Sequence, residues 1–220
     1  MCLALLQPGD TVVDVGAHVG LYCLACARQV GLSGQVLALE PMPWTYAVLR
    51  RLAAESRCGN ISTLRVAASD ADCLLWMSVP LDRYGLANYY LARITSQPVR
   101  HSTQVRTVAL DGLLRSLSIT VMKVDVEGDE FPCLQGSLAT IRRCRPALLV
   151  EIGGPAGAPS ESERAAVFAL LAGQGYQVFM LDGGQLHPWS KRFRGINHWF
   201  LQPEHLISLR RCCPPLLRPK

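Results

Sequence analysis

Hydrophobic positions along the chain follow two periods, one typical of buried strands and one typical of helices. Short apolar runs rich in β-branched residues predict strands over residues 11–15, 35–40, 61–67, 119–126 and 146–152. Apolar residues at helical spacing predict helices over residues 19–30, 44–54, 130–141 and 160–172. Strands and helices that alternate in this way predict an α/β fold, a doubly wound and mostly parallel sheet with helices on both faces.

Two parts of the chain depart from this alternation. Runs at 177–181 and 197–201 have no helix between them, which predicts an antiparallel hairpin closing one edge of a seven-stranded sheet. The stretch 81–106 has weak periodicity and carries several Tyr and Arg residues. Long insertions of this kind tend to be a substrate wall or lid, and a plain surface excursion is the alternative. We predict a single domain over residues 1–205.

The composition supports a globular chain: 50% of the 220 residues are hydrophobic and 18% are charged. Charged residues interrupt every long apolar run, so we predict neither a transmembrane helix nor stable membrane insertion. The N-terminus lacks the basic start of a signal peptide. Nine scattered cysteines favour a reducing, cytoplasmic compartment. Cys23 and Cys26 form a C-x-x-C pair inside a helical pattern, which we interpret as small buried hydrophobes.

The net charge of +5 is concentrated near the C-terminus. Residues 186–220 hold seven Lys or Arg against a single acid, Glu204. A basic, proline-rich tail over 206–220 could contact nucleic acid or a membrane surface. Its basic residues alternate with prolines and leucines rather than aromatics, so we predict a loosely held terminus and no nucleic-acid partner. Nothing in the sequence specifies an oligomeric state.

Candidate chemistry begins at the turn after the first strand, DVGAHVG, because open α/β sheets bind ligands at the carboxyl ends of their strands. Gly16 allows a tight turn and Gly20 lets the next helix pack closely. His18 stands where a dinucleotide fingerprint has its second glycine. The Asp14 carboxylate would repel a pyrophosphate but could receive an ammonium group, which favours S-adenosylmethionine over NAD. Glu40, which closes the second strand, could accept hydrogen bonds from both ribose hydroxyls.

A second group of polar residues follows the fourth and fifth strands. Alternation predicts Lys123, Asp125 and Glu127 on one face, and Glu151 ends the neighbouring strand. In one interpretation Asp125 or Glu127 is a general base while Lys123 steadies the charge. In another, Asp125 and Glu151 hold a divalent metal that polarises a hydroxyl. The structural alternative is an ion pair between Lys123 and Glu151 with Glu127 as a helix N-terminal acid. His101 is an alternative base.

Five segments, VVDVGAHVG, LALEPMP, VAASD, MKVDVEGDE and PALLVEI, resemble in order and spacing the FkbM family of S-adenosylmethionine-dependent methyltransferases. The resemblance implies a class I methyltransferase, Rossmann-like fold and methyl transfer to a hydroxyl of a small molecule, sugar or glycolipid. It implies that Asp14 and the glycines line the methionine end, that Glu40 holds the ribose and that Asp70 lies near the adenine. The expected cofactor-binding residues are Asp14, Gly16, Ala17, His18, Gly20, Glu40, Pro41, Ala68 and Asp70.

The chain also departs from this family. His18 stands where the family usually has Asn, and Asp129 where it often has Ala. The first strand begins close to the N-terminus, where relatives commonly carry a covering helix. Two alternatives to a methyltransferase therefore remain, a catalytically inactive cofactor-binding domain and an NAD-type oxidoreductase on the same architecture. Asp14 and the missing second glycine speak against the oxidoreductase.

Overall fold

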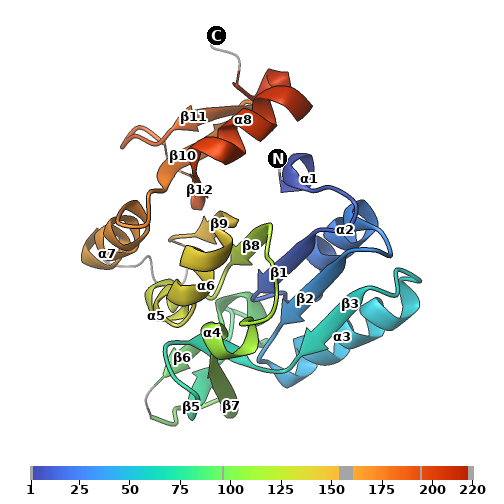
Figure 1. Ribbon diagram of the computed structural model, residues 1–220. Helices are drawn as coiled ribbons and strands as arrows, with labels where there is room; N and C mark the ends of the chain where they lie inside the picture. The colour runs from blue at the N-terminus through green and yellow to red at the C-terminus, as the bar shows by residue number, and fades with distance from the viewer. Residues whose placement is uncertain (1, 96, 154–160, 194, 218–220) are drawn as a thin grey trace.

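The central feature of the computed structural model, which describes residues 2–95, 97–153, 161–193 and 195–217, is an eight-stranded sheet (Figure 1). Its strand order is β11-β10-β12-β9-β8-β1-β2-β3. The last five strands of that order are parallel, and β12, β10 and β11 pair antiparallel. The bounds are β1 Thr11–Val15, β2 Gln35–Leu39, β3 Ile61–Leu64, β8 Val121–Val124, β9 Ala147–Glu151, β10 Gln177–Asp182, β11 Gln185–Pro188 and β12 Asn197–Leu201.

Helices cover both faces of this sheet because successive strand residues point to opposite sides. Val12 and its alternates pack with α2 and α8, whereas Val13 and its alternates pack with α5, α6 and α7. Two hydrophobic cores therefore enclose the sheet. The helices are α1 Cys2–Leu5, α2 Leu21–Val30, α3 Pro43–Glu55, α4 Leu110–Leu113, α5 Glu130–Gln135, α6 Leu138–Cys144, α7 Glu161–Ala172 and α8 Pro203–Cys212, with 3₁₀ turns η1 Tyr89–Leu91 and η2 Pro214–Leu217.

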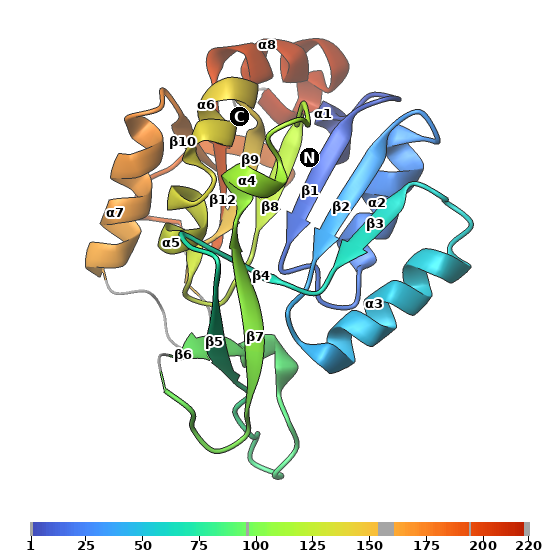
Figure 2. The same cartoon turned by 60° about the horizontal axis from the view of Figure 1, so that its bottom comes forward.

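A second, four-stranded sheet lies beyond the carboxyl ends of β1 and β2 (Figure 2). It contains β4 (Ala67–Ser69), β5 (Cys73–Ser78), β6 (Arg93–Thr95) and β7 (Ser102–Ala109), in the order β4-β7-β5-β6. The stretch 81–106 contributes β6 and the first part of β7 to this sheet. It has a small core of its own, which includes Met77, Ala92 and Val105.

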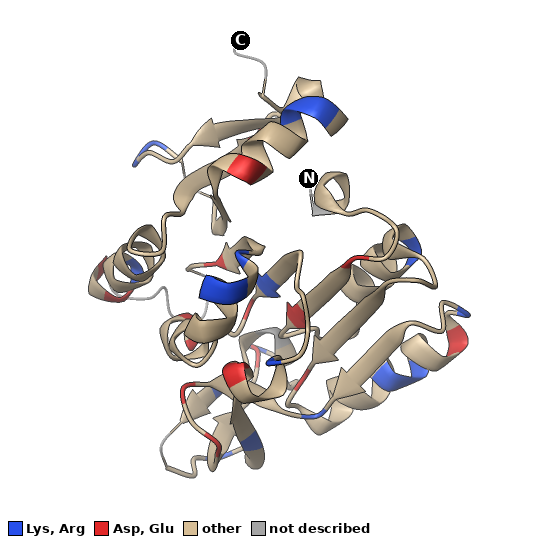
Figure 3. Cartoon of the chain, in the orientation of Figure 1, with Lys and Arg blue, Asp and Glu red and all other residues tan. Residues whose placement is uncertain are grey.

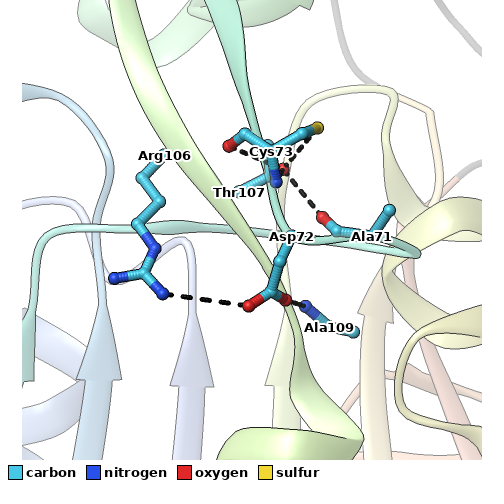
Figure 4. A network of polar contacts seen from close by, with 6 residues as sticks. All are labelled: Ala71, Asp72, Cys73, Arg106, Thr107 and Ala109. Atoms are coloured by element: carbon cyan, nitrogen blue, oxygen red, sulfur yellow. Dashed lines mark hydrogen bonds and ion pairs between the residues drawn. The ribbon is translucent and has the colours of Figure 1, made fainter.

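A network of polar contacts fixes the base of the second sheet (Figure 4). The buried Thr107 hydroxyl accepts a hydrogen bond from the Cys73 backbone N–H at 3.1 Å and donates one to the Ala71 carbonyl at 2.8 Å. Asp72 Oδ1 accepts a hydrogen bond from the Ala109 N–H at 2.8 Å. These contacts hold β5 in register with β7 where the sheet joins the rest of the fold.

The structure corrects several element predictions. The sheet has eight strands rather than seven, because β11 adds to the outer edge of β10. The strand predicted over 61–67 ends at Leu64, and the chain continues into the other sheet. The helix predicted over 130–141 is divided into α5 and α6 at Gly136. A side chain at Gly136 would collide with the Ser69 carbonyl oxygen, so β4 packs directly on this break.

The prediction of a loosely held tail over 206–220 is wrong for the residues that the structure describes. The boundary predicted at 205 falls inside α8, and η2 follows it. Leu209 and Leu216 are buried, and α8 packs against α1. Basic residues at the end of α8 lie on its exposed side, which made the segment look like a solvated terminus (Figure 3). Residue 160, where the helix over 160–172 was predicted to begin, and residues 218–220 lie outside the described residues.

Two expectations drawn from composition can be compared with the structure. No helix within the described ranges is both long and apolar enough to cross a membrane. Cys23 and Cys26 are buried in α2, as the interpretation of small buried hydrophobes predicts. No disulfide joins the eight cysteines whose side chains the structure describes. The cytoplasmic location itself stays a prediction.

Candidate active site

The turn between β1 and α2 brings the backbone unusually close to a neighbouring strand end. Gly16 has φ 75°, and a Cβ there would collide with the Asp125 carbonyl oxygen. The N–H of Gly16 donates to the Leu39 carbonyl at 3.0 Å, which ties the turn to the end of β2. A side chain at Gly20 would meet Leu49 of α3, as the predicted close packing requires. This turn and the ends of β2 and β8 therefore form one side of a cavity.

Glu40 is buried at the end of β2, and its carboxylate is already engaged. Oε2 accepts from the His18 N–H at 2.9 Å, and Oε1 accepts from the Met42 N–H at 2.9 Å and the Thr45 hydroxyl at 2.6 Å. A carboxylate has about four acceptor positions, so one remains for a ligand hydroxyl. The Thr45 hydroxyl also lies 3.1 Å from the Met42 carbonyl.

Lys123 lies between two carboxylates. Its Nζ is 2.9 Å from Asp125 Oδ2 and 3.5 Å from Asp14 Oδ1, in register across β1 and β8. The Cys23 thiol donates to the other Asp14 oxygen at 2.9 Å. Burial opposes the charge on Lys123, but the two carboxylates outweigh it and raise the lysine pKa. The ammonium therefore stays charged. The alternative prediction of an ion pair between Lys123 and Glu151 is wrong. Among the described contacts, Lys123 pairs with Asp14 and Asp125 instead.

Asp125, Glu127 and Glu151 form a cluster, with one carboxylate oxygen from each within 4.8 Å of the others. Strand alternation does not place Glu127 there: β8 ends at Val124, and Glu127 has φ 54° in the following turn. Burial, helped by the charges of Asp125 and Glu151, raises the pKa of Glu127 to about 7. Burial and the Asp125 charge also raise the pKa of Glu151. An acid that titrates near neutrality can act as a general base at physiological pH.

A cavity of about 240 Å³ connects the turn, Glu40 and the acid cluster. The expected site residues that line it are Gly16, Ala17, His18, Glu40, Pro41, Ala68, Lys123, Asp125 and Glu127. Four expected residues are not among those that line it. Asp14 is fully buried beneath the turn and faces Lys123 rather than the cavity. Gly20 packs on α3, Asp70 is exposed after β4, and Glu151 reaches the site only through the acid cluster.

The second sheet closes another side of this cavity with Met77, Tyr89, Ala92 and Ile94. The Tyr89 ring stacks on Trp44, at the start of α3, with centroids 5.2 Å apart. The aromatic content of the stretch 81–106, which includes Tyr89, indicated this region but not Met77, Ala92 or Ile94. Two polar contacts were also missed in the sequence, the Thr45 hydroxyl on Glu40 and the Cys23 thiol on Asp14. Thr45 could have been found, because it lies in the first turn of the helix that follows Glu40.

The two candidate histidines differ in position. His18 lines the cavity with φ 49°, a left-handed conformation that Asn adopts more readily than His. Burial lowers the pKa of His18 despite the nearby acids Glu40 and Asp125, so the imidazole is neutral at pH 7. His101 is exposed in the turn just before β7 and is not among the residues that line the cavity.

Comparisons with known proteins agree on the architecture. Residues 14–178 match the family model of the methyltransferase FkbM domain. The FkbM methyltransferase structure from Methylobacillus flagellatus KT aligns with a TM-score of 0.58 and 16% identity, covering 89% of this chain and 44% of that chain. Fibrillarin from Aeropyrum pernix, with natively bound S-adenosyl-L-methionine, aligns with a TM-score of 0.51 and 14% identity, covering 88% of this chain and 66% of that one.

One curated protein shares a short segment with this chain. Ribosomal RNA large subunit methyltransferase E from Azoarcus sp. (strain BH72) is 49% identical over 39 residues, which are 18% of this chain and 19% of that protein. So short a match carries no argument about substrate. The structural likenesses, at 14–16% identity, show the fold alone.

The doubly wound sheet, the glycine turn after β1 and the acid at the end of β2 define a class I, Rossmann-like methyltransferase fold. The FkbM family model covers more than half of the chain. This chain therefore belongs to the FkbM family of S-adenosylmethionine-dependent methyltransferases. It spans less than half the length of the Methylobacillus structure.

Proposed function

We propose that this chain transfers a methyl group from S-adenosylmethionine to a hydroxyl of a small molecule, sugar or glycolipid. The observation that carries the proposal is the acid cluster beside the cavity, in which the pKa of Glu127 is raised to about 7. A hydroxyl acceptor must lose a proton, and a carboxylate with that pKa can take it near neutral pH. Neither nucleic acid nor stable membrane insertion forms part of the proposal.

The cavity suits S-adenosylmethionine better than NAD. Gly16 keeps the turn open to a ligand, and Glu40 retains an acceptor position for the ribose. The apolar side chains of Met42, Ala68 and Ile94 would border the adenine. A pyrophosphate in this turn would approach the buried carboxylate of Asp14 without the second glycine of a dinucleotide fingerprint.

In the reaction, the bound cofactor supplies a methyl group on a positively charged sulfur. Glu127 would accept the acceptor's proton as the new O–C bond forms and the C–S bond breaks, leaving its electron pair on sulfur. Lys123 holds Asp125 by an ion pair and keeps part of the negative charge of the cluster compensated. The second sheet would orient the acceptor through Tyr89 and exclude water.

The same three carboxylates could instead hold a divalent cation, because oxygen ligands suit magnesium and calcium. The cation would polarise the acceptor hydroxyl. Turnover measured after treatment with EDTA, and again after magnesium is restored, separates the two alternatives. Loss with EDTA and recovery with magnesium would replace the general-base assignment of Glu127 by a metal site.

Calorimetric titration with S-adenosylhomocysteine is the first test, with NAD as the control ligand. We expect micromolar binding by the wild type, loss in Glu40→Ala and none for NAD. A screen of hydroxylated acceptors then tests turnover, which Glu127→Gln should lower by about 10²- to 10⁴-fold and the exposed Glu55→Gln should leave unchanged. Absence of binding by the folded wild type would refute the proposal. Binding without turnover of any acceptor would favour the inactive cofactor-binding domain.

A further inference from the structure

A second cavity, a groove of about 570 Å³, lies over the central sheet on the side of α1 and α2. Leu149 of β9 and Trp199 of β12 line it from the sheet, and both side chains are at least nine-tenths buried. Ala25 of α2 lines it from the helix, and Met180 from β10. Nothing in the proposed methyl transfer so far uses this groove.

The groove adjoins the catalytic side of the cofactor cavity. Tyr22 lines both, and its ring centroid is 5.7 Å from Lys123 Nζ. Lys123, Leu149 and Trp199 are register neighbours on β8, β9 and β12, so their side chains point to the same face. The floor of the groove therefore begins one strand away from the lysine of the site.

The polar end of the groove lies beside the acid cluster. Asn197 lines the groove and is in register with Glu151, one of the three clustered acids. Apart from Asn197, the Tyr22 hydroxyl and the indole N–H of Trp199, the described side chains that line the groove are apolar or thiol, and none is charged. A sugar or phosphate placed there would lose its hydrogen bonds to water without replacement, whereas an apolar group would not.

We propose that this groove binds an apolar portion of the methyl acceptor, aliphatic or aromatic, while the acceptor's hydroxyl reaches Asp125 and Glu127. The acceptor is then an amphipathic hydroxylated molecule rather than a bare sugar. This inference rests on the proposed function. The occupant is the acceptor because Asn197, which lines the groove, is in register with Glu151 of the acid cluster, and because Tyr22 lines both the groove and the cofactor cavity.

The probes that test this inference are n-octyl and methyl β-D-glucoside, titrated calorimetrically below the micelle concentration with S-adenosylhomocysteine present. Each buried methylene strengthens binding by about fourfold. With several methylenes in the groove, octyl glucoside should bind at least tenfold more tightly than methyl glucoside. Equal affinity for the two glucosides would overturn the inference. It would mean either that the groove takes no ligand or that another protein segment covers it.

Ala25→Phe locates the binding site, because Ala25 lines the groove but not the cofactor cavity. This variant should reduce the preference for octyl glucoside to less than threefold and leave S-adenosylhomocysteine affinity unchanged. Arg28→Phe is the matched control, because Arg28 is also exposed, lies one turn further along α2 and lines neither cavity. It should retain the full preference.

The two proposals fail in distinguishable ways. A preference for octyl glucoside that Ala25→Phe leaves intact overturns the groove inference alone, since cofactor binding is measured separately. If the folded wild type does not bind S-adenosylhomocysteine, the proposed function fails and the acceptor assignment of the groove fails with it. An unchanged S-adenosylhomocysteine affinity together with a lost octyl preference in Ala25→Phe supports both.

Discussion

Lys123→Met removes the positive charge that lies between Asp14 and Asp125. The Asp14 side chain is fully buried, whereas that of Asp125 keeps 26% of its surface exposed. In the variant, water can therefore hydrogen-bond to Asp125 in place of the lysine, but it cannot reach Asp14. Removing one partner of a buried pair typically costs about 3–5 kcal/mol. Because the 3.5 Å contact with Asp14 is the longer of the two, we expect about 3 kcal/mol, a large part of a domain's total stability.

The cause can be tested by removing the buried charge as well. Asp14→Asn keeps an oxygen that can accept from the Cys23 thiol but is neutral. If the cost of Lys123→Met comes from the unpaired Asp14 charge, the double variant should be about 1–3 kcal/mol more stable than the sum of the single changes predicts. Urea unfolding followed by circular dichroism gives each free energy of unfolding.

A control variant separates this effect from general loss of a lysine. Lys191 is 89% exposed and lies 4.0 Å from the exposed Glu161, so Lys191→Met should change stability by less than about 0.5 kcal/mol. Additive effects of Lys123→Met and Asp14→Asn would refute the reasoning, because two coupled buried charges cannot contribute independently.

Four further predictions concern the cavity. With Glu127 as base, kcat/KM should rise with pH up to about pH 7 and level off, and Glu127→Gln should lose this limb. The folded-state pKa of Glu127 is raised, so the contribution of this residue to stability is complete below about pH 4.5 and is lost as the pH rises through about 7. The free energy of unfolding in urea should therefore fall across this range for the wild type but not for Glu127→Gln. Gly16→Ala should abolish S-adenosylhomocysteine binding and lower the unfolding free energy by at least about 2 kcal/mol, because its Cβ meets a backbone oxygen. Thr45→Val should weaken calorimetric S-adenosylhomocysteine binding about tenfold, because Glu40 loses a hydroxyl that orients it.

Local patterns predicted the parts of the fold that depend on local physics. The five parallel strands and the glycine turn are confirmed. A β-branched run favours a strand, and Gly16 permits a tight turn, through interactions with residues that are close in sequence. The path after Leu64 was not predictable, because a strand's period does not reveal which sheet it joins. The burial of α8 was hidden for a related reason: the helix, whose Leu209 is buried, packs against α1, which lies about two hundred residues earlier in the chain.

The candidate site shows the same division. Each polar residue at a strand end could be named from its position, because the carboxyl ends of parallel strands meet at one edge. Tyr89 and Ile94 approach the cavity only through the pairing of β5, β6 and β7, which no local pattern specifies. Glu127 likewise reaches the cluster through a left-handed backbone conformation in the turn after β8, which ends at Val124. It does not reach the cluster through the alternation of side chains along a longer strand.

The Asp14→Asn variant, already needed for the Lys123 experiment, also decides between two roles for Asp14. A carboxylate that contacts the methionine ammonium directly would make Asp14→Asn lose S-adenosylhomocysteine affinity at least tenfold. The structure instead buries Asp14 beneath the turn, where it accepts from Cys23 and pairs with Lys123. Its influence on the site then passes through the lysine to Asp125, so Asp14→Asn should lower turnover more than cofactor affinity. Calorimetric titration of this variant beside the wild type distinguishes a cofactor ligand from a residue that positions the catalytic acids.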